Sequence, residues 1–313
     1  MPSSTSDSDR RTATRAIVVL LAALFGYFCA LEAATRMAFP RINHIWRSIQ
    51  ADHLRAVSLR PDAPDKSVSM LIVGNSYLEV GVNRDSLQQE IAPNYSLAYL
   101  PMSGTSYLDW YFGLRRLFAE GSRPAIVGVC LSTRDLLSDS TYGGPFANSL
   151  MLKRDILEVK EESHLDNTAA SEYFFANFSS WMGHRGEIHN WLLRKTAPSI
   201  NDLALYFKPK NRTLPPTEEI VAKALPRLHL LDELCRQNGS RFFLLIPPTR
   251  DVNDASNELQ AAAAKEGLLV VLPYQHAELP ESAFLDGSHL NPKGAALFTE
   301  RLGPTLLQSL YRN

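Results

Sequence analysis

Short apolar runs and longer amphipathic segments alternate along the chain after residue 67. The apolar runs cover residues 70–73, 95–100, 125–132, 242–246 and 268–272. Runs of this length that end in turn-forming residues are typical of strands buried on both faces of a parallel sheet. The segments with helical spacing cover residues 83–91, 107–118, 218–237, 255–266 and 292–310. Strands that alternate with helices predict an α/β fold, a three-layer α/β/α domain around a parallel sheet.

Two of these predicted helices contain helix-breaking residues. Pro226 lies inside the helix predicted over 218–237. Proline removes a backbone hydrogen bond and clashes with the preceding turn, so we expect a kink or a division there. Gly303 and Pro304 mark an expected break in the last helix, which Pro292 opens as a good first-turn residue.

A separate apolar stretch lies near the N-terminus. Residues 16–31 carry no charge, and the run continues to Ala34 with only Glu32 interrupting it. A helix needs about 20 apolar residues to cross the hydrocarbon core of a membrane. We therefore expect a transmembrane anchor over residues 16–34.

The charges before this stretch predict its orientation. Arg10, Arg11 and Arg15 precede it, and basic residues remain on the cytoplasmic side of a membrane. These arginines also argue against a buried core helix. The sequence thus predicts a cytoplasmic tail over residues 1–15, with the chain after the anchor on the other side of the membrane.

A cleaved signal peptide is the alternative interpretation of the apolar stretch. Residues 30–34 are rich in small side chains, as a cleavage site requires. Glu32 and Arg36 fit such a site poorly, and this favours an uncleaved anchor.

The rest of the chain divides by composition. Residues 35–66 predict a helical stem and a proline-containing linker, and the α/β domain follows over 67–313.

Residues 136–215 do not alternate cleanly between strands and helices, and we interpret them as an insertion beside the carboxyl edge of the sheet. Its aromatic side chains predict either a lid or sugar-binding wall, or the insertion's own small core. These side chains are Tyr173, Phe174, Phe175, Phe178, Trp181 and Trp191.

Composition excludes several classes of function. The 313 residues carry a formal net charge of -1, so no overall basic field attracts nucleic acid. The three cysteines lack metal-ligand spacing, and we interpret Cys130 and Cys235 as buried thiols of a strand and a helix. His184, Glu187 and His189 do not match the spacing of a known metal site. We expect no metal and no other cofactor.

The first apolar run ends in Gly74, Asn75 and Ser76. Gly74 is expected to permit a sharp turn. Ser76 would then lie just past the carboxyl end of a strand, where open α/β sheets bind their ligands. Ser76 is a candidate nucleophile, although a serine that only caps the turn is the simpler interpretation of this stretch alone. A nucleophilic hydroxyl also needs a base.

A candidate base lies near the other end of the chain. Asp286 precedes His289 by three residues, just before the last predicted helix. If the backbone between them turns, the carboxylate can fix the imidazole tautomer and support the imidazolium that forms when His289 takes the Ser76 proton. The Asp-x-x-His pattern is weak by itself. Its pairing with an early strand-Gly-x-Ser block is more specific.

These two blocks resemble those of the SGNH (GDSL-like) hydrolase superfamily. Its first block is usually Gly-Asp-Ser, and here Gly74-Asn75-Ser76 takes that place, while Asp286 and His289 match its last block. The resemblance implies an SGNH/flavodoxin-like fold over roughly residues 68–310. It looks closest to membrane-anchored bacterial proteins that move acyl groups on cell-surface polysaccharides, such as the alginate O-acetyltransferase group. Asn75 departs from the pattern, and we expect it to be tolerated because Asp286 supplies the triad carboxylate.

The resemblance also implies donors for an oxyanion. The backbone N–H groups of Ser76 and Gly104 would hold it, and Gly104 follows the second predicted strand. A plain glycine turn before a helix is the alternative interpretation of Gly104. Many relatives carry a further Asn near the end of the third strand. This chain has Ser132, Thr133 and Arg134 there, and which of them substitutes is open.

The resemblance predicts an extracytoplasmic acyltransferase or esterase. It would act on O-acyl groups, expected to be acetyl, of a cell-surface polysaccharide through Ser76, His289 and Asp286. We expect a single-pass protein of the bacterial inner membrane with its catalytic domain in the periplasm. By analogy with such systems, a multispanning membrane protein would supply acyl groups across the bilayer. The alternative is a non-catalytic SGNH-like glycan-binding or scaffold component of a polysaccharide-modification complex.

Overall fold

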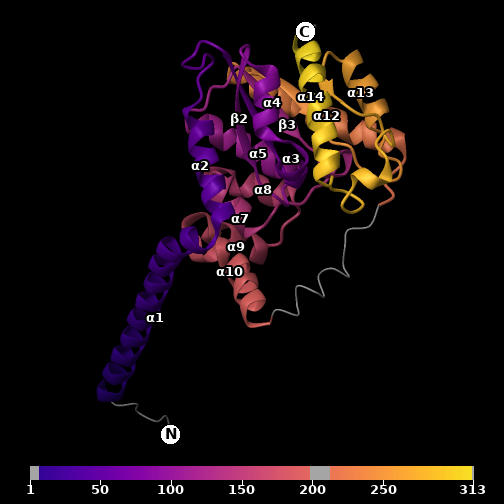
Figure 1. Ribbon diagram of the computed structural model, residues 1–313. Helices are drawn as coiled ribbons and strands as arrows, with labels where there is room; N and C mark the ends of the chain where they lie inside the picture. Colours follow the sequence, from indigo (N-terminus) through magenta and orange to yellow (C-terminus); the bar gives the residue numbers. More distant parts are fainter. Residues whose placement is uncertain (1–6, 198–211, 312–313) are drawn as a thin grey trace.

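The computed structural model describes residues 7–197 and 212–311 (Figure 1). A five-stranded parallel sheet forms the centre of the domain, with the strand order β2-β1-β3-β4-β5. The strands are β1 (Val68–Gly74), β2 (Tyr95–Pro101), β3 (Ile126–Cys130), β4 (Arg241–Leu245) and β5 (Val270–Val271). This is the flavodoxin-like order of a doubly wound sheet. It confirms the predicted α/β class.

Helices cover both faces of the sheet, as Figure 1 shows. One layer holds α3 (Ser76–Gly81), α4 (Arg84–Ile91) and α14 (Pro292–Tyr311). The other holds α2 (His44–Ser58), α5 (Tyr107–Ala119), α12 (Thr217–Gln237) and α13 (Ser256–Lys265). Successive strand residues point to opposite faces. Ile72 therefore packs with the first layer, whereas Val73 packs with the second.

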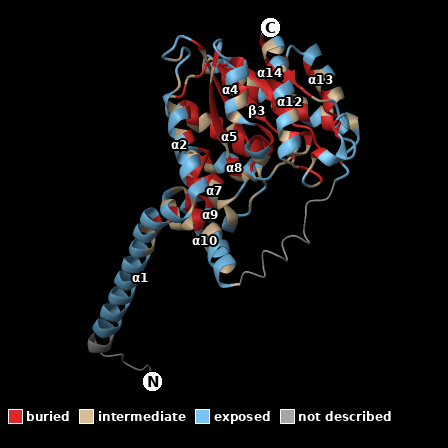
Figure 2. Ribbon diagram, in the orientation of Figure 1, coloured by how far each residue is buried: buried red, intermediate tan, exposed pale blue. Residues whose placement is uncertain are grey.

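Burial on both faces explains the continuous apolar runs of the sequence. All residues of β3 are buried, and so are residues 69–74 of β1. The centre of the domain around β3 appears red in Figure 2. Gly74 does not have a left-handed backbone. A Cβ atom there would instead lie 2.7 Å from the carbonyl oxygen of Cys130 on the neighbouring strand. The glycine serves the close approach of β1 and β3, rather than the sharp turn that we expected.

The division expected at Pro226 and the break expected at Gly303 and Pro304 are wrong, because both helices are continuous. Pro226 lies inside α12, which is not divided there, and Pro304 lies inside α14. Residues on both sides of Pro226, including Ala224 and Leu228, are fully buried, and this packing offsets the missing hydrogen bond. Gly303 has a packing role, because a Cβ atom at this position would overlap Glu90 of α4. Tertiary contacts thus keep both helices continuous.

Element boundaries differ from the prediction in two further places. A short helix that was not predicted, α3, begins at Ser76 itself, and the helix predicted over 83–91 corresponds to α4. The strand predicted over 268–272 shrinks to the two residues of β5, because β5 is the edge strand and pairs only with the end of β4. Cys130 in β3 and Cys235 in α12 are buried and unpaired.

A group of helices lies between β3 and α12, in the region of the predicted insertion. They are α6 (Thr133–Leu136), α7 (Gly144–Ser149), the 3-10 turn Lys153–Asp155, α8 (Ile156–Glu162), α9 (Asn167–Phe178) and α10 (Ser180–Thr196). Residues 198–211 of that insertion lie outside the described part of the chain. Tyr173 packs into the main core, whereas Phe174, Phe175, Phe178 and Trp191 are exposed.

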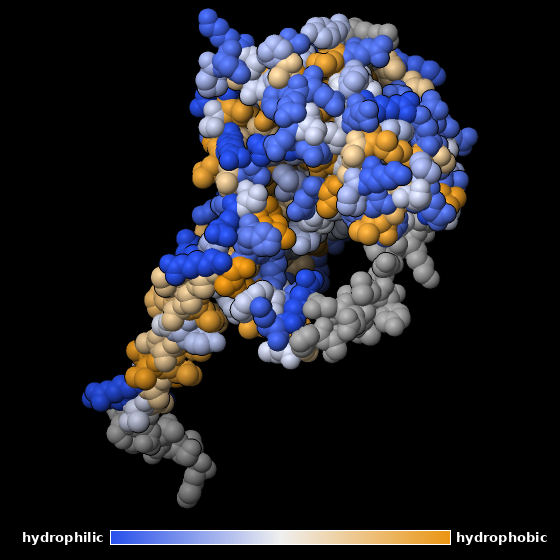
Figure 3. Space-filling model, in the orientation of Figure 1, coloured by the Kyte–Doolittle hydropathy of each residue, from blue (hydrophilic) through white to orange (hydrophobic). Residues whose placement is uncertain are grey.

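The N-terminal helix α1 (Asp7–Ile42) projects away from the domain (Figure 1). Residues Arg10–Ile42 form the one helix in the described chain that is long and apolar enough to cross a membrane. Its apolar side chains form an orange band along the projecting helix in Figure 3. The helix contains the predicted anchor and continues into the predicted stem.

Candidate active site

Ser76 is the first residue of α3 and follows β1 by two positions. The side chain of Asn75 caps this helix, since its Oδ1 accepts a hydrogen bond from the N–H of Tyr77 at 3.1 Å. Asn75 thus takes the capping role that we had considered for Ser76. The Ser76 hydroxyl is left for another contact.

Ser76 and His289 meet although 213 positions separate them. The Ser76 Oγ lies 2.8 Å from Nε2 of His289. On the other side of the ring, Nδ1 lies 3.0 Å from Oδ2 of Asp286. The parallel sheet causes this meeting, because β1 ends at the rim to which the loop before α14 returns. The three side chains form the connected chain hydroxyl, imidazole and carboxylate.

Asp286 is held in an ionised form by its surroundings. Its Oδ1 accepts the backbone N–H groups of Ser288 and His289, both at 2.7 Å. Partial burial acts to raise the pKa of Asp286, but these hydrogen bonds and the His289 ring outweigh it, so the pKa lies below its usual range. The carboxylate is therefore charged at neutral pH and can support an imidazolium.

Tyr77 contacts the outer face of the imidazole, and the sequence interpretation missed it. Its ring stacks on His289 with centroids 5.3 Å apart and an interplanar angle of 24°. Its hydroxyl accepts a hydrogen bond from Nη2 of Arg134 at 2.7 Å, and Arg134 also pairs with Asp251 at 3.3 Å. The only sequence signal was the position of Tyr77 beside Ser76. Tyr77 restricts the rotation of the imidazole.

Most side chains considered as a further oxyanion donor are hydrogen-bonded or ion-paired to other residues. Ser132 Oγ donates to Oδ2 of Asp135 at 2.8 Å, and Arg134 is held by Tyr77 and Asp251. Thr133 is buried and does not line the pocket around Ser76. The amide of Asn75 also donates to Asp135, at 2.8 Å. None of the three residues after the third strand, Ser132, Thr133 and Arg134, therefore takes the place of the missing Asn.

Two backbone N–H groups are available at the pocket. Those of Ser76 and Gly104 donate to no other group within the described parts of the chain. Both residues line a cavity of about 360 Å³ that also contains His289. The other lining residues are Asn75, Tyr77, Thr105, Ser106, Arg134, Asp135, Ser138, Ser140 and Arg212. None of the six aromatic residues of the insertion lines this cavity, so they do not form a wall against Ser76.

Gly104 has a conformation that favours glycine. Its φ is +84°, and a Cβ atom would lie 2.5 Å from Cε2 of the Tyr142 ring. We expect Gly104→Ala to move the backbone N–H and to lower the rate of ester turnover by about 10²-fold or more, the usual effect of losing one oxyanion donor. Steady-state kinetics with an acetyl ester measures this.

Gly121→Ala is the matched control for that variant. Gly121 has a φ of +104°, but no atom lies near its virtual Cβ and it does not line the cavity. Both substitutions place an alanine in a left-handed backbone conformation, which destabilises the fold by about 1 kcal/mol in each case. Equal rates for the two variants would remove Gly104 from the oxyanion site.

Asp109 joins the segments that carry Ser106 and Tyr142. It is fully buried, and its carboxylate accepts the N–H groups of Ser106 at 2.7 Å and Tyr142 at 2.8 Å. Burial raises the pKa of Asp109 from its ordinary 3.8 to about 7, against the opposing effect of these hydrogen bonds.

This raised pKa predicts a pH dependence of stability. Between about pH 4 and pH 7 the folded chain retains a proton on Asp109 that the unfolded chain has released. The contribution of Asp109 to stability therefore falls as the pH rises. Relative to wild type, Asp109→Asn should gain on the order of 1 kcal/mol per pH unit in this window. Denaturant unfolding in detergent at several pH values measures it, and a pH-independent difference would contradict the assignment.

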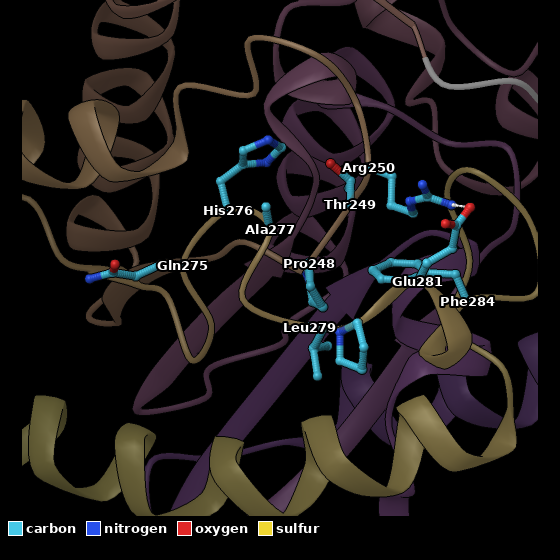
Figure 4. Close-up of a pocket in the computed structure, with 10 residues that line it drawn as sticks. Pro248, Thr249, Arg250, Gln275, His276, Ala277, Leu279, Glu281 and Phe284 are labelled. Carbon is cyan, nitrogen blue, oxygen red and sulfur yellow. Dashed lines mark hydrogen bonds and ion pairs between the residues drawn. The ribbon is translucent and has the colours of Figure 1, made fainter.

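A second cavity of about 360 Å³ lies next to the loop that carries Asp286 and His289. Figure 4 shows Arg250 and Glu281 at its edge, paired at 2.5 Å. The backbone N–H of Arg250 donates to the carbonyl of Gly287, which ties this wall to the loop. Neither Ser76 nor His289 lines this cavity. The hydroxyl–imidazole pair therefore belongs to the first cavity.

Comparison with known proteins gives only distant structural likeness. No family model matches the chain, and no curated protein matches its sequence. Among solved structures, TesA is similar with a TM-score of 0.39 at 15% identity, covering 77% of this chain and 99% of its own.

Two further solved structures overlay with the same TM-score of 0.39. A member of the lipolytic protein G-D-S-L family from Veillonella parvula is 10% identical and covers 74% of this chain and 94% of its own. A lipase from a goat rumen metagenome is 11% identical and covers 76% and 97%. These overlays are loose, and the function is therefore argued from the chain's own geometry.

Proposed function

We propose that this chain is an SGNH-like serine acyltransferase or esterase that acts on acetyl groups of a cell-surface polysaccharide. The observation that carries the proposal is the 2.8 Å contact between Ser76 Oγ and His289 Nε2, with Asp286 on the opposite ring nitrogen. This arrangement is the one that activates a serine for acyl transfer. It comes from two distant segments, which makes coincidence a poor explanation.

The geometry supports a two-step mechanism. Ser76 attacks the acyl carbonyl while His289 takes its proton, and Asp286 stabilises the imidazolium. The N–H groups of Ser76 and Gly104 hold the oxyanion. His289 then gives the proton to the leaving alcohol, and an acyl-serine remains. A sugar hydroxyl or water attacks this ester in the second step, with His289 as base again.

The lining of the cavity favours a small acyl group and a hydrated acceptor. Thr105, Ser106, Ser138 and Ser140 are among its lining residues, and the lining contains no aliphatic side chain. A long acyl chain needs an extended apolar pocket. A sugar ring presents hydroxyl groups that can exchange hydrogen bonds with such a wall.

Position beside a membrane supports transfer rather than hydrolysis. The helix Arg10–Ile42 is long and apolar enough to be an anchor, and the arginines at its N-terminal end favour a periplasmic domain at the bacterial inner membrane. A multispanning membrane protein would then supply the acyl group, and the polysaccharide would accept it.

The experiment that tests the proposal is labelling of the detergent-solubilised chain with a fluorophosphonate probe, which reacts with activated serines. Wild type should be labelled and Ser76→Ala should not. Ser171→Ala is the matched control, because Ser171 is an exposed serine of α9 that bonds only to its own helix. Labelling that persists in Ser76→Ala would remove Ser76 as the nucleophile.

A non-catalytic glycan-binding or scaffold component is the second candidate. The observation in its favour is that none of Ser132, Thr133 and Arg134, after the third strand, replaces the Asn that many relatives carry there. An unlabelled wild type that still binds polysaccharide would support this role over the enzymatic one.

A further inference from the structure

The anchor helix and the domain are joined by a specific contact at Glu32, the one charged residue of the stretch 16–34. Its carboxylate accepts the hydroxyl of Ser179 at 2.7 Å and the N–H groups of Ser180 and Trp181, both at 3.0 Å. These residues open α10. The first turn of α10 therefore lies level with the end of the apolar run of α1.

An exposed phenylalanine patch, formed by Phe174, Phe175 and Phe178, ends α9 at the same level. These side chains are 46%, 56% and 46% exposed, and the rings of Phe174 and Phe178 lie 4.8 Å apart. Arg36 of α1 donates to the carbonyl of Phe178 at 3.4 Å. The patch thus continues the apolar surface of α1 onto the domain.

Helix α10 extends from this junction on the side of the domain from which α1 projects (Figure 1). Its 17 residues span about 25 Å. Trp191 and Leu192 are exposed near its end, and Arg194 and Lys195 follow them in the last turn. Neither basic side chain has an ion-pair partner within residues 7–197 and 212–311.

Exposed aromatic rings followed by basic side chains are the signature of a surface at the boundary between lipid and water. The rings lie at the depth of the headgroups, and the basic groups pair with anionic lipids. Lys153 fits this picture, because its Nζ lies 3.9 Å from the centroid of the Phe178 ring, a position that keeps a cation at the edge of an apolar surface.

We propose that the phenylalanine patch and the exposed residues near the end of α10 contact the lipid of the anionic membrane that α1 crosses. The domain is then seated on the bilayer and is not merely tethered to it. The occupant of this surface is lipid. The proposal concerns the surface beside α1 and does not depend on the chemistry at Ser76.

The test uses the full chain in phosphatidylethanolamine–phosphatidylglycerol vesicles with brominated acyl chains, which quench nearby fluorophores. Cys29→Ser removes the exposed native cysteine. Fluorophores are then attached at Phe175→Cys and Leu192→Cys. Leu230→Cys is the matched control, because Leu230 is 50% exposed on α12, and Val19→Cys in α1 is the positive control. Probes at 175 and 192 should be quenched at least about threefold more than the probe at 230.

Charge reversal distinguishes binding of the basic side chains to anionic lipid from mere closeness of the domain to the membrane. Arg194→Glu with Lys195→Glu should reduce quenching at position 192 in anionic vesicles, whereas Arg236→Glu on α12, where Arg236 is exposed, should not. In vesicles of phosphatidylcholine alone the reversal should have little effect.

Two outcomes would overturn the proposal. The first is quenching at 175 and 192 no stronger than at 230 while position 19 is strongly quenched, which describes a domain held only by its tether. The second is that probes at 175 and 192 are not quenched in pure lipid vesicles but are protected from an aqueous quencher in native membranes. That pattern would assign the surface to a membrane protein.

Discussion

Ser76→Ala should lower kcat/KM for hydrolysis of a soluble acetyl ester by about 10³- to 10⁶-fold. The hydroxyl at 2.8 Å from the imidazole is the group that forms the acyl intermediate in the proposed mechanism. Removing it leaves only the oxyanion donors and binding. KM should change much less than kcat, because alanine alters neither the cavity wall nor the two backbone N–H groups. Steady-state kinetics in detergent measures both constants.

The same substitution should leave the fold intact. Ser76 is partly exposed, and Asn75 supplies the cap of α3. The free energy of unfolding should therefore change by about 0.5 kcal/mol or less. Acylation of surface polysaccharide in cells should fall in parallel with the rate. Unchanged acylation with a folded Ser76→Ala chain would favour the scaffold role, and Ser171→Ala should behave as wild type in every assay.

Asp286→Asn should lower kcat by about 10⁴-fold. The carboxylate accepts a hydrogen bond from the N–H group at Nδ1 of His289. This bond fixes the tautomer in which Nε2 is unprotonated and can accept the Ser76 proton. An amide can present its NH₂ group to Nδ1 and so favour the opposite tautomer, in which Nε2 carries the proton. An amide also provides no charge to stabilise the imidazolium. The loss should appear in kcat, since Asp286 does not line the cavity.

Asp232→Asn on α12 is the control for this variant, because it makes the same chemical change away from the site. A loss of less than about tenfold for Asp286→Asn would show that the carboxylate only holds the loop through the N–H groups of Ser288 and His289. A serine–histidine pair would then suffice for the reaction.

The proposed site combines a serine, a base and two backbone donors, and none of Ser132, Thr133 and Arg134 takes the third position. Asn75 stands where the family usually has Asp. Its NH₂ group donates hydrogen bonds to Thr105 and Asp135, and its side-chain oxygen caps α3. It therefore acts on the turn and not on the substrate. This explains physically how the chain accommodates Asn75 without loss of the serine–histidine contact.

Much of the layered fold followed from local pattern. The apolar runs of β1 to β4 are buried on both faces. In a chain where short apolar runs alternate with amphipathic helices, such a run indicates a strand of a parallel sheet. The division expected at Pro226 and the break expected at Gly303 were wrong. Burial of Ala224 and Leu228, and the close approach of Glu90 to Gly303, outweigh local propensity. The pair Tyr77 and Arg134 could not be foreseen either, since their contact joins α3 to α6.

By itself, the sequence determined the type of sheet, the residues at its carboxyl rim and the three candidate groups Ser76, Asp286 and His289, because each depends on spacing within one short segment. Only the tertiary structure decided that Ser76 and His289 lie 2.8 Å apart, that Tyr77 stacks on the imidazole and that Glu32 fastens the anchor to α10. These contacts join segments that share no local pattern, and their geometry arises from the packing of whole layers against one sheet.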